Sequence, residues 1–88
     1  MANKRDIKKD LNYVIGDIIE AVYIWELSNP KKSTKDSEAI IDDAIQVFNE
    51  LIIRVNQRDY NSAKTHFKSI YNDLETKGKE LIERINSL

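Results

Sequence analysis

Apolar residues recur along the chain at alternating spacings of three and four positions, which is the period of one face of an α-helix. The pattern runs through three segments, which we place at residues 4–28, 35–56 and 60–86. A β protein of this length would need more turn residues than the two glycines and one proline that are present. The pattern therefore predicts three long helices.

The first break between helices is the polar stretch SNPKKSTKD at residues 28–36. It contains the only proline, Pro30, which biases the residue before it away from helical backbone. The cap of the second helix is expected at Ser33, Thr34 or Ser37, because a side-chain oxygen there can accept a hydrogen bond from a free backbone N–H.

The second break is the stretch NQRD at residues 56–59, where Asp59 is expected to cap the third helix. Short connections make sequential helices antiparallel. We therefore expect an all-α fold, an up-down-up antiparallel three-helix bundle that forms one domain over residues 1–88. Its expected core contains Leu11, Ile18, Trp25, Phe48, Leu51, Phe67, Ile70 and Leu74.

The first helix differs from the others because apolar residues lie on two of its sides. Its core side is expected to contain Ile7, Leu11, Val14, Ile18, Ala21, Val22 and Trp25, with Ile15 at the edge. On the opposite side a second stripe is formed by Tyr13, Gly16, Tyr23, Ile24 and Leu27. The second segment has one clear outlier, Ile53, with Ile45 and Val47 at its edge, and the third has a single apolar face.

Two neighbouring helices cannot cover residues that lie half a turn away from the core. We expect the second stripe to contact a second copy of the chain in a homodimer, or a helix of another protein. Gly16 would let another backbone come close, or it is only a weak helix position. The alternative is that these are scattered exposed apolar residues, which are common on soluble proteins.

Composition narrows the class of protein. With 88 residues, 41% of them hydrophobic and 33% charged, the chain is too apolar for a disordered tail and too charged for a membrane span. It has no cysteine, so disulfides and thiolate chemistry are excluded. The charged start, MANKRDIKKD, lacks the apolar segment of a signal peptide. We therefore expect a cytoplasmic protein without a membrane partner.

Charge is unevenly distributed although the net charge is only −1. The expected fold brings eight cations and four acidic residues to one end, with a net charge of +4 there and −5 in the rest of the chain. The cations of this basic end are Lys4, Arg5, Lys8, Lys9, Arg54, Arg58, Lys64 and Lys68. Binding of phosphate or nucleic acid at this end is an alternative function, although interleaved Asp6 and Asp10 favour an ordinary solvated surface.

The sequence contains no motif of catalysis or cofactor binding. His66 is the only histidine, and no carboxylate lies three or four positions away to complete a metal pair. Glu38, Asp42 and Asp43 crowd the first turns of the second helix, where acidic residues stabilise the helix dipole. The glycines are too far apart for a phosphate-binding loop. We expect no enzyme activity, no metal and no cofactor.

The opening stretch KRDIKKDLNYVIGDIIEA, residues 4–21, resembles the start of a group of small uncharacterised helical proteins from Bacteroidetes-type bacteria. The resemblance implies a small cytosolic all-helical protein and brings no functional residues with it. The matching residues are Lys4, Arg5, Lys8, Lys9, Asn12 and Tyr13.

Overall fold

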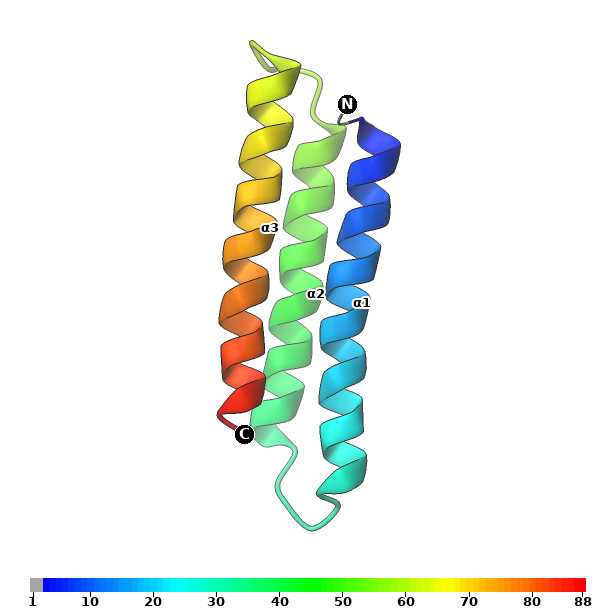
Figure 1. Ribbon diagram of the computed structural model, residues 1–88, viewed down its shortest axis with the longest axis vertical. Coiled ribbons are helices and arrows are strands. Elements are labelled where there is room, and N and C mark those ends of the chain that lie inside the picture. The colour runs from blue at the N-terminus through cyan, green and yellow to red at the C-terminus, as the bar shows by residue number, and fades with distance from the viewer. Residues whose placement is uncertain (1–2) are drawn as a thin grey trace.

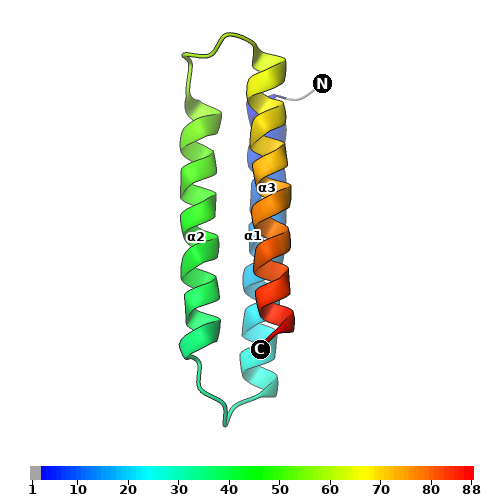
Figure 2. The same cartoon turned by 90° about the vertical axis from the view of Figure 1, so that its left-hand side faces the viewer.

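The computed structural model describes residues 3–88 and shows three helices packed side by side in a rod of 50 × 17 × 16 Å (Figure 1). Helix α1 spans Lys4–Ser28, α2 spans Lys35–Asn56 and α3 spans Ala63–Asn86. Helices α1 and α3 run in the same direction and α2 runs in the opposite direction, with the two connections at opposite ends (Figure 2). The predicted up-down-up bundle is confirmed.

The bounds of α1 and α2 agree with the predicted ranges, whereas α3 begins at residue 63 instead of 60. Its cap is Ser62, whose Oγ accepts a hydrogen bond from the backbone N–H of Thr65. The predicted cap, Asp59, is wrong because the chain is not yet helical there. The ring of Tyr60 stacks on His66 at 4.5 Å between ring centres, so the connection folds back on the first turns of α3.

The N-cap of α2 is Thr34. Buried Ser37, in the first turn, fixes how the helix is rotated about its axis. Ser37 Oγ lies 2.6 Å from Glu26 Oε2 on α1 and 3.0 Å from the carbonyl oxygen of Thr34. This contact turns Ile40 into the core, where it is 2% exposed, and leaves Ile41 only half-buried. The apolar spacing of the second segment, at positions 41, 44, 48, 51 and 55, favours Ile41 as the buried residue. That prediction is wrong by one position.

The core runs the length of the rod between the three helices. It contains Ile7, Leu11, Ile15, Ile18, Val22, Ile40, Ala44, Leu51, Val55, Phe67, Ile70, Leu74 and Leu81. Six of the eight predicted core residues are therefore confirmed as buried. Ile15, predicted at the edge, belongs to the core, whereas Phe48 is half-buried and packs against the core from the side.

Trp25, the other predicted core residue, is also only half-buried. Helices α1 and α3 run parallel with Ile18 against Gly78, so one heptad further Trp25 is level with Ile85 in the last turn of α3. The end of α1 extends past the end of α3 (Figure 1), so the bundle no longer encloses the indole ring. Instead the ammonium of Lys32 lies 5.9 Å from the ring centre.

Phe67 gives a direct test of the core. Its side chain is 6% exposed and lies beside the rings of Tyr60 and His66. Replacing it by alanine removes a buried ring and leaves a cavity, so Phe67→Ala is expected to lower the free energy of unfolding by about 3–5 kcal/mol. Urea unfolding followed by circular dichroism measures this loss, and a loss below about 1 kcal/mol would place Phe67 outside the core.

Candidate functional site

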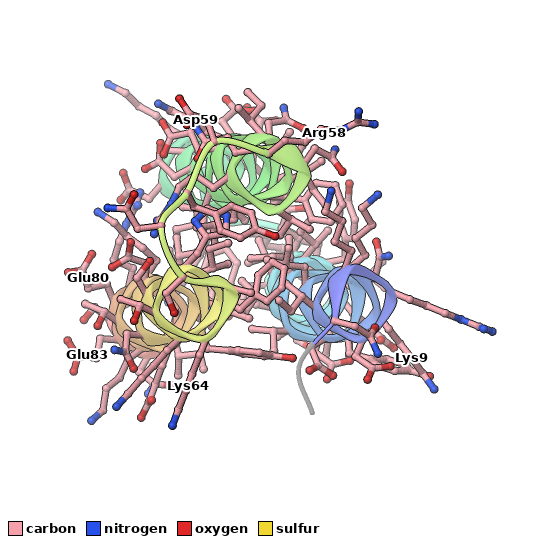
Figure 3. All side chains as sticks on the ribbon, turned by 90° about the horizontal axis from the view of Figure 1, so that it is seen from above. Lys9, Arg58, Asp59, Lys64, Glu80 and Glu83 are labelled. Atoms are coloured by element: carbon pink, nitrogen blue, oxygen red, sulfur yellow. The ribbon has the colours of Figure 1, made fainter. Side chains whose placement is uncertain are left out.

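The outer face of α1 carries a row of exposed apolar side chains. Tyr13 is 60% exposed, Tyr23 52%, Ile24 55% and Leu27 82%. Together with exposed Gly16 these residues form what we call the α1 stripe: Tyr13, Gly16, Tyr23, Ile24 and Leu27. The helix has no other helix on this side, because α2 and α3 both pack against its opposite face (Figure 3). The structure thus leaves all five predicted residues exposed.

The apolar surface extends from α1 onto both neighbouring helices. A groove of about 550 Å³ between α1 and α3 is lined by Tyr13 and by Ile82, which is 49% exposed. A smaller groove of about 210 Å³ between α1 and α2 is lined by Gly16 and by Ile45, which is 46% exposed. The apolar face predicted for the third helix is therefore wider than the buried row, since exposed Ile82 lies at its edge. Exposed Ile53 lines neither groove, so it lies apart from this surface.

Gly16 has no function in the packing of its own chain. A Cβ atom built on it would meet no side-chain atom or neighbouring helix within 4 Å. Glycine in the interior of a helix nevertheless costs about 1 kcal/mol relative to alanine. This chain does not require glycine at position 16. The φ angle there is ordinary for a helix, and the open space would accept a side chain.

The charges of α1 oppose the dipole of the helix. Its first two turns carry Lys4, Arg5, Lys8 and Lys9 against two aspartates, although the N-terminus of a helix favours negative charge. Beyond Asp10 the helix has only acidic charges, Asp17, Glu20 and Glu26, and its last turn contains no basic residue. The charges of α1 are therefore basic at the start and acidic in the remainder, which is the reverse of the arrangement that stabilises an isolated helix.

At the basic end, one of the predicted phosphate-binding residues has an internal partner. Arg54 forms an ion pair with Asp73 and donates a hydrogen bond of 2.8 Å to Ser69 Oγ, so it joins α2 to α3. Asp73 thus belongs to the same end and lowers its net charge to +3. Lys9 and Arg58 point outward from different helices (Figure 3), so these cations do not converge on one point.

The remaining candidate residues do not form a chemical site. His66 Nε2 lies 2.7 Å from the carbonyl oxygen of Arg54, which holds the ring between α2 and α3. Glu38 contacts the hydroxyl of Thr34, and Asp43 pairs with Arg84. Among residues 3–88, no group of three or more His, Cys, Asp or Glu side chains is placed to hold a metal ion. The expected absence of enzyme activity stays a prediction.

Comparisons with known proteins provide no relative. A scan against protein-family models finds no match, and searches of curated proteins and of solved structures find none either. The resemblance of residues 4–21 to the group of bacterial helical proteins therefore stays a prediction. No helix in the described part of the chain has the length and the apolar character that are needed to cross a bilayer.

One polar contact fixes the groove between α1 and α3. The hydroxyl of Tyr71 donates a hydrogen bond of 2.7 Å to Asp10 Oδ2. Partial burial of the phenol, followed by this bond and the negative charges of Asp10 and Asp6, raises the pKa of Tyr71 to about 12. The folded state thus favours the neutral phenol, which keeps α1 and α3 in register.

This raised pKa predicts a loss of stability at alkaline pH. The contribution of Tyr71 to the free energy of unfolding is complete below pH 10, where the phenol is neutral in both the folded and the unfolded state. It is lost as the pH rises from 10 to 12. Tyr71→Phe should cost about 1 kcal/mol at neutral pH and should flatten this part of the decline. Denaturant unfolding at several pH values measures both effects, and an unchanged alkaline slope in the variant would contradict this assignment.

The open space around Gly16 predicts a stabilising substitution. Gly16→Ala should raise the free energy of unfolding by about 0.5–1 kcal/mol, because alanine favours the helix and its methyl group meets no obstacle within the chain. Urea unfolding at high dilution measures this change in the single chain. A loss of stability under those conditions would mean that the helix is packed more closely there than the structure indicates.

Proposed function

We propose that this chain is a small non-enzymatic interaction protein that uses the α1 stripe to bind another helical surface. That surface belongs either to a second copy of the chain or to a helix of a different protein. In both cases the contact is centred on the α1 stripe, and Gly16 leaves room there for a group of the partner. The protein works in the cytoplasm and needs no cofactor.

The observation that carries the proposal is the clustering of exposed apolar residues around one helix. Among residues 3–88, seven large apolar side chains are exposed, and four of them lie on α1. Two more, Ile45 and Ile82, line the grooves on either side of α1. Six of the seven thus lie on α1 or beside it. Exposed apolar residues gathered on one part of a protein are typical of a binding site, whereas single scattered ones are ordinary.

The basic end is the weaker candidate. Arg54 is held by Asp73 and Ser69, and Lys9 and Arg58 point away from each other (Figure 3). Binding of nucleic acid therefore stays an alternative prediction from the sequence, and no contact in the structure favours it over the apolar surface of α1.

Site-specific photocrosslinking tests the proposed surface whether the partner is a second copy of the chain or a different protein. A photoreactive phenylalanine analogue at position 24 should give a discrete crosslinked species in cells that produce the protein, and also in the purified chain if the partner is a second copy. The same analogue at position 53 is the matched control, because Ile53 is 64% exposed but lies on α2, away from the α1 stripe. Equal crosslinking at both positions would contradict the proposal.

A further inference from the structure

We infer that the α1 stripe binds a second copy of this chain, with the two α1 helices antiparallel and Lys9 of each copy beside Glu20 of the other. This inference rests on the proposed function, which it deepens by naming the partner and its orientation. It follows from three features of α1 that the packing inside one chain leaves unexplained: the apolar stripe, the exposed glycine and the charges that oppose the helix dipole.

The distribution of charge along α1 favours a second copy in the antiparallel orientation. The basic turns from Lys4 to Lys9 would lie along the acidic stretch from Asp17 to Glu26 of the other α1. Each helix then places opposite charges beside those of the other. The two helix dipoles also point in opposite directions, which is favourable. A parallel pair would place Lys9 against Lys9 and Glu20 against Glu20, which is repulsive.

The spacing of the outer face determines which residues meet. Lys9, Tyr13, Gly16, Glu20, Tyr23 and Leu27 follow one another at steps of four and three, as in the contact seam of a coiled coil. In an antiparallel pair the numbers of facing residues have a constant sum. The alignment that places Gly16 opposite the other copy's Tyr13 therefore also places Lys9 opposite its Glu20.

This alignment explains both the glycine and the tyrosine. Gly16 has no side chain and open space around it, so it can accept the ring of Tyr13, which is 60% exposed in the single chain. The ammonium of Lys9 already lies 5.9 Å from the centre of that ring. Two-fold symmetry produces the Gly16–Tyr13 contact twice at the centre and a Lys9–Glu20 ion pair on each side of it.

A shift by one heptad is the main competing antiparallel alignment. It would pair Tyr13 with Tyr23, but it would place Glu20 opposite Gly16 and Lys9 opposite Leu27, so both charges would enter the seam without an opposite charge. The chosen alignment also overlaps the helices from Lys4 to Trp25 of each copy. Tyr23 and Ile24 then lie against the first turn of the other α1, and Leu27 lies just beyond its start. Of these two alignments, charge pairing favours the one that places Lys9 opposite Glu20.

Charge exchange at positions 9 and 20 tests this geometry. Lys9→Glu and Glu20→Lys each create two like-charge contacts in the dimer and should weaken dimerisation by roughly tenfold. The double variant Lys9→Glu/Glu20→Lys restores opposite charges and should recover the wild-type dissociation constant within about threefold. Sedimentation equilibrium over a dilution series measures the dissociation constant of each purified full-length variant.

Matched controls separate the local pairing from a change in net charge. Lys64→Glu and Glu83→Lys change the net charge by the same amounts, but both side chains project from α3 (Figure 3). Neither control should change the dissociation constant by more than about threefold. High salt screens exposed charges. It should therefore reduce the difference in dissociation constant between the wild type and the variants at positions 9 and 20.

Three results would overturn the inference. The first is a wild-type chain that remains a monomer at the highest soluble concentration. The second is a dimer that neither single variant weakens, which would mean a parallel pair or another alignment. The third is a double variant that is as weak as the single ones. Crosslinking from position 24 to a different protein would refute the dimer but leave the proposed function standing, whereas no preference for position 24 over 53 would refute both.

Discussion

A helix that packs against only two neighbours can bury only the side that faces them, and this constraint governs the structure. The three helices occupy the corners of a triangle (Figure 3), so each one keeps an outward side. For α2 and α3 that side is mostly polar. For α1 it carries four exposed large apolar residues in addition to five that are buried in the core. The fold of one chain therefore accounts for one side of α1 and leaves the apolar residues of the other side exposed.

Side-chain polar contacts hold the helices in the rotation that produces this result. Ser37 and Glu26 join α1 to α2, Arg54 and Asp73 join α2 to α3, and Tyr71 binds an aspartate of α1 from α3. Every pair of helices is thus joined by at least one such contact, in addition to the apolar core. Because these contacts are directional, they oppose rotation of α1 about its axis, which would exchange stripe residues for core residues.

The sequence predicted the fold, the bounds of α1 and α2 and the exposure of the α1 stripe, because these features depend on periodicity alone. It could not decide between adjacent Ile40 and Ile41, since a polar contact from another helix sets the rotation of α2. It placed Trp25 too deep because the relative lengths of the helices decide where the core ends. Ile82 was missed for a related reason: one apolar residue next to the core row gives no periodic signal of its own.

The central claim is that the outer face of α1 is covered by a second copy lying alongside the first. Small-angle X-ray scattering of the wild-type chain over a concentration series measures mass and longest dimension together. The account predicts that the mass doubles while the longest dimension stays close to the 50 Å of one rod, because the antiparallel α1 helices overlap almost fully. A mass of one chain at every concentration, or a doubled mass with a nearly doubled length, would contradict it.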